Sequence, residues 1–233
     1  MLENFRSTSE LGLYSVASKI PAFLSILSSI FIQAWSISSI KEFDYENDNK
    51  FYSLVFKYYS ILMFMGTSFI LLIIKPFMSV YVGESFFIAW RYAPFLVVGT
   101  SYYAMSSFFG SLYGAAKKNI SVALSTFVAA IINITINLVW LPGNGIIVAS
   151  ISTLVSYFVI AMWRMYGVNK IVSIEINYIK FATNSILVIL QSIFVTLDIN
   201  IYFNSLVILF IIFVVNFRDI LNICKILTKR LIK

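Results

Sequence analysis

A chain of 233 residues with 60% hydrophobic and only 12% charged residues has more apolar surface than a soluble domain of this size buries. This composition excludes a soluble globular protein and indicates an integral membrane protein. Aromatic residues, which are included in the hydrophobic share, make up 17% of the chain.

Seven apolar runs follow in chain order, each close to the roughly 20 residues that a helix needs to cross a bilayer. They cover Leu11 to Ile40, Leu54 to Phe77, Phe86 to Gly114, Ile120 to Leu141, Ile146 to Tyr166, Phe181 to Leu197 and Tyr202 to Phe217. The sequence DINIYFN joins the last two and predicts a tight hairpin, because one long helix would carry Asp198 into lipid. A β-barrel is the competing architecture, but runs such as SLVILFIIFVV are apolar on every side. We therefore predict an all-α, polytopic bundle of about seven transmembrane helices.

Lysine and arginine predict the orientation of this bundle. If alternate loops face the cytoplasm, thirteen of these residues share one side and three share the other. The positive-inside rule then places the N-terminus outside and the C-terminus inside. The larger set is Lys41, Lys50, Lys57, Lys117, Lys118, Arg164, Lys170, Lys180, Arg218, Lys225, Lys229, Arg230 and Lys233, and the smaller is Arg6, Lys75 and Arg91. The net charge of +7 thus reflects topology, in loops that meet membrane lipids, and no nucleic acid is expected as a partner.

Motifs of an enzyme or a metal centre are missing from the sequence. The chain has one cysteine, Cys224, and no histidine, which removes thiol clusters and histidine chemistry. Neither a phosphate-binding glycine loop nor a Gly-x-Ser-x-Gly motif occurs. The carboxylates of the first cytoplasmic loop alternate with basic and amide residues, as in a solvated linker; they are Glu42, Asp44, Glu46 and Asp48. We expect no enzyme activity, no catalytic residue, no metal site and no cofactor.

One basic residue falls inside the first apolar run. Lys19 comes eight residues after Leu11, about 12 Å along a helix, which is near the middle of the bilayer if the helix starts at Leu11. A charge at that depth usually faces a bundle interior or a wet cavity. The alternative is a helix that starts higher, from which Lys19 reaches the outer headgroups. Pro21 removes an amide donor, so the helix should kink there and could bend as a hinge.

Other polar residues recur at helical spacing within the apolar runs. Tyr102, Ser106 and Gly110 form one stripe, with Tyr103, Ser107 and Ser111 on the adjoining stripe. Asn133 and Asn137 share a helix face, and Gln33 follows Ser25, Ser28 and Ser29. Such residues are also the usual contacts between membrane helices, and Gly110 with Gly114 forms a Gly-x-x-x-Gly pair. Packing and substrate contact both remain open for them, and together they predict a bundle with a hydrophilic interior.

Three stretches resemble one family of transporters. They are SELGLYSVASKIPAFLSILSSIFIQAW, then LYGAAKKN, and then INITINLVWLPGNGIIVASISTLVSYF, in which Asn133, Asn137, Pro142, Gly145, Ala149, Thr153 and Tyr157 fit the pattern. Over nearly its whole length the chain resembles the C-terminal half of bacterial polysaccharide repeat-unit flippases. These O-antigen and capsule transporters belong to the multidrug/oligosaccharidyl-lipid/polysaccharide exporter superfamily.

The resemblance implies a fold and a function. Residues 1–167 would form an incomplete C-terminal transporter lobe, and residues 168–233 a terminal helix pair with a basic cytoplasmic tail. The chain would be a truncated or partial form, or half of a two-chain transporter, in the bacterial plasma membrane. It would move undecaprenyl-pyrophosphate-linked oligosaccharide to the outer leaflet, with polysaccharide polymerase machinery as a further implied partner. The resemblance places Lys19 on the pyrophosphate or an acidic sugar, with Gln33, Tyr103, Ser107, Asn133 and Asn137 as further substrate-binding candidates.

Two other functions remain alternatives. A cation-coupled multidrug exporter of the same superfamily would share the helix order, but ion coupling generally uses buried carboxylates, and none lies well inside the seven runs. A membrane-embedded glycan polymerase or ligase would also be apolar and multi-pass. Such enzymes tend to have large outward loops, whereas the outward loops here are short.

Overall fold

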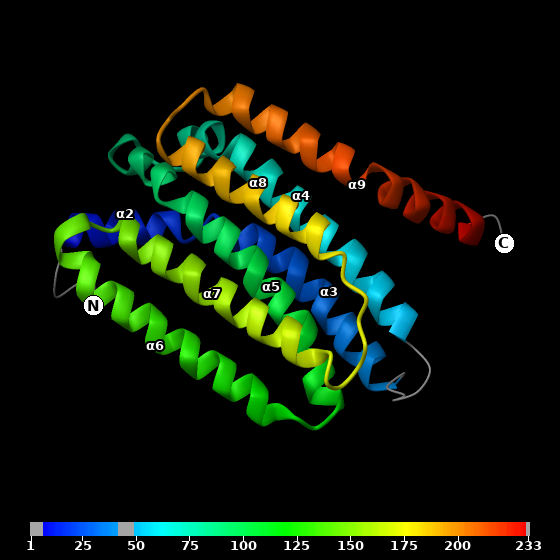
Figure 1. Ribbon diagram of the computed structural model, residues 1–233. Helices are drawn as coiled ribbons and strands as arrows, with labels where there is room; N and C mark the ends of the chain where they lie inside the picture. The colour runs from blue at the N-terminus through cyan, green and yellow to red at the C-terminus, as the bar shows by residue number, and fades with distance from the viewer. Residues whose placement is uncertain (1–6, 42–48, 232–233) are drawn as a thin grey trace.

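The computed structural model describes residues 7–41 and 49–231 (Figure 1). These described residues form helices and no strands, which confirms the all-α prediction. The predicted solvated linker with Glu42, Asp44, Glu46 and Asp48 lies outside the described residues.

Two helices replace the single first segment that the sequence predicts. The first, α2 (Thr8–Ala17), is capped by Ser7, whose hydroxyl accepts the Glu10 amide at 3.3 Å. The second, α3 (Pro21–Lys41), begins with the proline, whose missing amide hydrogen is not needed in a first turn. Between them the Ala17 carbonyl accepts the Ile20 amide at 3.3 Å. The predicted kink at Pro21 is thus confirmed, as a full break in the helix.

The remaining segments follow the predicted order. They are α4 (Asn49–Tyr81), the 3₁₀ helix η1 (Glu84–Arg91), α5 (Ala93–Ala115), α6 (Asn119–Asn144), α7 (Ile147–Val168), α8 (Tyr178–Thr196) and α9 (Ile201–Leu231). Asp198 lies in the predicted turn between α8 and α9, where its φ of 59° reverses the chain. Among the described residues, six helices are long and apolar enough to cross a membrane: α3, α4, α6, α7, α8 and α9.

The long helices lie side by side, with α5 in the middle and α6 and α9 on opposite edges (Figure 1). α5 is the most enclosed, because 17 of its 23 residues are buried. Trp35 joins α3 to it: the indole ring stacks on Phe108 at 4.3 Å between centroids and its Nε1 donates to the Phe108 carbonyl at 3.1 Å. Val188 of α8 and Ile212 of α9 belong to the same hydrophobic core, so the terminal pair packs onto the rest of the bundle.

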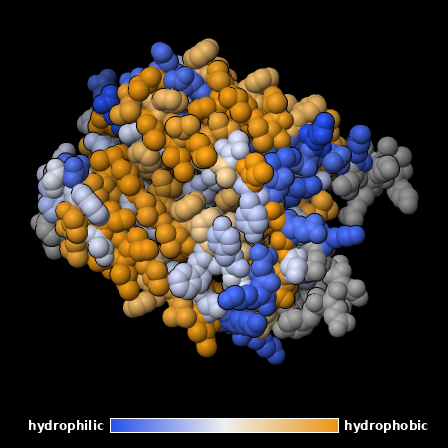
Figure 2. Space-filling view, viewed as in Figure 1, coloured by the Kyte–Doolittle hydropathy of each residue, from blue (hydrophilic) through white to orange (hydrophobic). Residues whose placement is uncertain are grey.

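The outside of the bundle is apolar. Figure 2 shows hydrophobic side chains over most of the visible face, with hydrophilic ones gathered mainly toward its right-hand end. Large exposed side chains include Ile30 of α3, Phe127 of α6 and Phe210 of α9. Contiguous apolar surface of this extent is unfavourable in water and suits the hydrocarbon of a bilayer.

Candidate functional site

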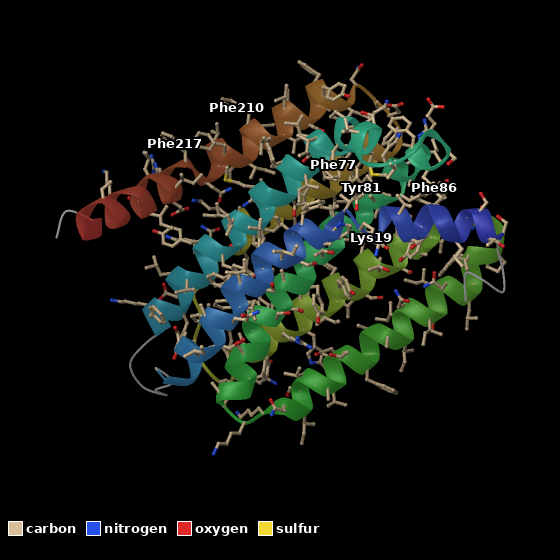
Figure 3. All side chains as sticks on the ribbon, turned by 180° about the vertical axis from the view of Figure 1, so that it is seen from behind. Lys19, Phe77, Tyr81, Phe86, Phe210 and Phe217 are labelled. Atoms are coloured by element: carbon tan, nitrogen blue, oxygen red, sulfur yellow. The ribbon has the colours of Figure 1, made fainter. Side chains whose placement is uncertain are left out.

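Lys19 lies in the break between α2 and α3, and its side chain is exposed (Figure 3). The apolar span of α3 begins two residues later, at Pro21, so Lys19 precedes that span. Turn hydrogen bonds occupy the backbone here, since the Lys19 carbonyl accepts the Ala22 amide at 3.2 Å. The break therefore presents an ammonium at one end of α3, the same end at which Phe77, Tyr81 and Phe86 lie.

A polar surface continues from this end along α3 and α5. On α3, Ser29, Gln33 and Ser36 are spaced as one helical stripe, and Gln33 and Ser29 are exposed. On α5, Tyr103 is 48% exposed and Ser107 and Ser111 are half-buried. We call these six residues the hydroxyl face.

Two contacts place the two stripes of the hydroxyl face side by side. Ser36 Oγ and Ser111 Oγ lie 3.0 Å apart, and Trp35 Nε1 bonds the Phe108 carbonyl at 3.1 Å. α3 and α5 run in the same direction, and the residues that contact each other are separated by 75 and 73 positions in the sequence. Gln33 therefore lies level with Ser107. Tyr103 also packs on Tyr157 of α7, at 4.9 Å between ring centroids. The predicted second stripe of α5 is thus the accessible one, whereas Tyr102 and Ser106 of the first stripe are buried.

Asn133 and Asn137 lie away from this face, in the contact between α6 and α7. Both side-chain amides donate to Ser152 Oγ, Asn137 at 2.8 Å and Asn133 at 3.3 Å. Asn137 is buried and Asn133 is half-buried. These contacts support the packing interpretation of the two asparagines, and their substrate contact stays a prediction.

Arg164 is a polar centre that the sequence analysis misses. Although the charge count assigns it to a loop, it lies in the last turns of α7 and is only 6% exposed. Its guanidinium donates to α5 through the Ser106 carbonyl at 3.2 Å. It donates to α6 through Ser125 Oγ at 3.0 Å and Thr126 Oγ1 at 2.9 Å. No carboxylate of the described residues forms an ion pair with it. An arginine within an apolar run is the signal that could have pointed to this site.

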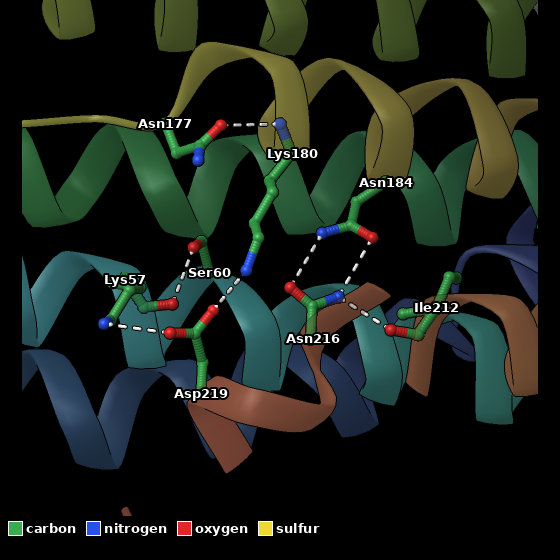
Figure 4. A network of polar contacts seen from close by, with 8 residues as sticks. All are labelled: Lys57, Ser60, Asn177, Lys180, Asn184, Ile212, Asn216 and Asp219. Atoms are coloured by element: carbon green, nitrogen blue, oxygen red, sulfur yellow. Dashed lines mark hydrogen bonds and ion pairs between the residues drawn. The ribbon is translucent and has the colours of Figure 1, made fainter. Parts of the chain in front are cut away.

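A second charged centre joins α4, α8 and α9 (Figure 4). Asp219 of α9 is 13% exposed, with Lys57 Nζ at 3.1 Å from one oxygen and Lys180 Nζ at 2.6 Å from the other. Asn177 caps α8 by accepting the Lys180 amide at 3.0 Å, which fixes the start of the helix that carries this lysine. α9 continues past Phe217, the predicted end of the last run, and its apolar span reaches Ile223, so Asp219 lies near the end of that span. Because each oxygen of this carboxylate already contacts an ammonium group, Asp219 is poorly suited to bind a coupling cation.

Asp198 anchors the opposite end of the bundle. Lys75 Nζ lies 2.7 and 2.9 Å from its two oxygens, and Arg91 lies at 3.8 Å. The two cations also flank Trp90, at 4.7 Å and 5.4 Å from the ring centroid. This cluster ties the α8–α9 hairpin to α4 and η1. It also places Lys75 and Arg91 at one end of the bundle; with Arg6, which is not described, these two formed the smaller set in the count of basic residues.

Replacing Asp198 by asparagine should lower the free energy of unfolding by at most about 1 kcal/mol, because the ion pairs are partly exposed. The loss should shrink as salt screens the charges. Asp198→Ala should cost more, because asparagine tolerates the positive φ of this turn better than alanine does. Unfolding in mixed micelles at low and high salt measures both effects. An asparagine variant as stable as the wild type at low salt would show that the cluster does not hold the hairpin.

Comparison of the chain with known protein families, curated proteins and solved structures gives no match. The class of protein therefore follows from the molecule itself. Six long apolar helices packed on a hydrophobic core indicate a multi-pass helical membrane protein.

Proposed function

We propose that this chain is a lipid-linked oligosaccharide flippase of the bacterial plasma membrane, in which the hydroxyl face forms one wall of the transport path. The observation that carries the proposal is the hydroxyl face, an accessible row of hydroxyl and amide groups on helices whose other outward surfaces are apolar. Sugars present many hydroxyl groups, and neutral donors and acceptors bind them without the cost of burying a charge. The proposal also rests on the resemblance of the chain to polysaccharide repeat-unit flippases.

Lys19 would bind the anionic part of the substrate. It lies at one end of α3, exposed, while the hydroxyl face occupies the same helix farther along. No ion pair of the described residues involves Lys19. An ammonium that has no counterion among the described residues is suited to the pyrophosphate, and the helix break at Pro21 would let α3 tilt against α2 during transport.

The proposed topology has seven spans, with the N-terminus outside and the C-terminus inside. α5 would be the seventh span: it has 23 residues, enough to cross, and the other helices shield its polar side chains from lipid. The charges support this orientation, since Lys75 and Arg91 lie at the end of the bundle opposite to Lys57 and Lys180.

Complementation tests this function. The chain is expressed in a strain that lacks its own O-antigen or capsule flippase, and surface polysaccharide is measured beside a full-length flippase. We expect polymer to be restored, and Lys19→Ala to reduce it about tenfold or more, because a hydrogen bond to a charged group contributes about 1.5–3 kcal/mol. Lys19→Arg should retain most activity.

Lys118→Ala is the matched control, since it removes an exposed lysine from the opposite end of the bundle. Inserted protein is quantified for each variant. A Lys19→Ala variant with full activity would contradict the role of Lys19. Inserted wild-type chain that restores no polymer, while the full-length flippase does, would contradict the proposal that this chain moves the substrate.

A further inference from the structure

A cavity of about 840 Å³ opens between α4, α8, α9 and the connection from α7 to α8, and no part of the proposed transport path includes it. Its mouth carries three lysines, Lys50, Lys57 and Lys180, and two carboxylates, Glu175 and Asp219. All of these lie at the end of the bundle that the positive-inside rule assigns to the cytoplasm. Basic cavities between membrane helices on that side are typical binding sites for anionic headgroups.

The lysines at the mouth keep donors available for a ligand. Asp219 takes one contact from Lys57 at 3.1 Å and one from Lys180 at 2.6 Å, and each ammonium has three N–H groups. Two donors on each lysine therefore remain. Among the described residues Lys50 forms no ion pair. Asp219 thus acts as a positioning residue that holds two ammonium groups on the cavity wall.

The deeper part of the cavity is apolar with one polar pair. Phe64 comes seven residues after Lys57 on α4, about 10 Å farther into the bundle, and it lines the cavity with Ile61 and Phe181. Asn184 and Asn216 lie at this depth and are joined to each other by hydrogen bonds of 3.1 and 3.4 Å. A basic mouth above an apolar interior matches a ligand with an anionic head and an apolar tail.

We propose that this cavity binds a phosphate-bearing ligand, with the phosphate at Lys50, Lys57 and Lys180, and that the ligand is an acidic phospholipid of the surrounding membrane. A soluble phosphate ester shares the same headgroup chemistry. The apolar lining around Phe64 favours the lipid, because a soluble ester would leave it uncovered. The proposal is independent of flippase activity.

Native mass spectrometry of the purified full chain in non-ionic detergent tests the site. Dissociation constants are measured for phosphatidylglycerol, phosphatidylcholine, glycerol 3-phosphate and inorganic phosphate. We expect phosphatidylglycerol to bind more tightly than phosphatidylcholine. Lys50→Gln should weaken its binding about fivefold, the contribution of one lysine near an anionic headgroup. The exposed side chain of Lys50 makes this variant neutral for folding.

Lys118→Gln is the matched control, because it removes the same charge from the same end of the bundle outside the cavity. It should change binding less than twofold. Displacement of phosphatidylglycerol by glycerol 3-phosphate or inorganic phosphate at similar concentrations would support the phosphate site and assign it to a soluble ligand. The site is refuted if no phosphate-bearing probe binds, or if Lys50→Gln and Lys118→Gln weaken binding equally.

Discussion

Arg164→Ala should lower the free energy of unfolding by about 3 kcal/mol, one of the two largest effects that we expect from a single substitution. The guanidinium joins three helices, through Ser106 of α5 and Ser125 and Thr126 of α6. Alanine removes these hydrogen bonds to a charged group and leaves a cavity where a large buried side chain had been. Unfolding of the purified chain in mixed micelles, followed by circular dichroism, measures the loss.

Two further substitutions separate the charge of Arg164 from its shape. Arg164→Met keeps most of the volume without the charge and should cost less than alanine. Arg164→Lys keeps the charge, but a single ammonium cannot reach α5 and α6 together as the planar guanidinium does. A buried charge with too few partners is costly, so lysine should destabilise the chain at least as much as methionine.

Arg218→Ala is the control for the loss of an arginine, because Arg218 is exposed on α9. It should change the free energy of unfolding by less than about 0.5 kcal/mol. A lysine variant of Arg164 as stable as the wild type would show that the forked geometry is not what joins the helices.

Gly99→Val should destabilise the chain by about 1–3 kcal/mol, because the backbones of α5 and α7 approach closely at this glycine. A Cβ atom on Gly99 would lie 3.1 Å from Leu154 Cα and 3.4 Å from Leu154 N. Both atoms are backbone, so the neighbour cannot relieve the contact by changing a rotamer and the two helices would have to separate. Gly99→Ala should cost less, because only the Cβ contact arises.

Gly143→Ala provides the control for glycine removal from a helix. No atom lies within 4 Å of a Cβ placed there, and Gly143 is helical. Alanine should be neutral or stabilising by up to about 1 kcal/mol, through its higher helix propensity. Unfolding in mixed micelles compares the three variants, and equal stability of Gly99→Val and Gly143→Ala would contradict the close approach of α5 and α7.

The close contact at Gly99 was not predicted from the sequence, which pointed to Gly110 and Gly114 instead. The spacing of Gly110 and Gly114 predicts a helix contact, and Gly110 does face α7, where a Cβ would lie 3.3 Å from Arg164 Nη1. A Cβ at Gly114 would meet only Asn119 Oδ1 at 3.9 Å, so the two glycines do not form one close approach. Spacing establishes that two glycines share a face of a helix. It does not establish which neighbour that face meets.

The same limit applies to the candidate site, where spacing predicts which residues share a helix face but not which face is exposed. Spacing correctly separates two stripes on α5, but Tyr102 and Tyr103 are the same residue type, and only packing decides that Tyr103 is exposed while Tyr102 is buried. The count of basic residues assigned Arg164 to a loop, because it follows position along the chain, and it took no account of Asp219. Their partners lie on other helices, 38 residues away for Thr126 and 162 for Lys57.

The sequence by itself determined the features that the surrounding hydrocarbon imposes on any membrane-spanning chain. Composition and the lengths of the apolar runs predict a membrane protein with helical spans, since a chain in hydrocarbon must satisfy its backbone hydrogen bonds within each helix. Pro21 likewise predicts a kink and the polar DINIYFN stretch a tight turn, because those effects are local. Only the tertiary structure decided how each helix is rotated, which stripe of α5 is accessible, and how Lys57, Lys180 and Asp219 meet at one cavity. Those outcomes depend on the packing of side chains between helices that are distant in sequence, which periodicity alone does not encode.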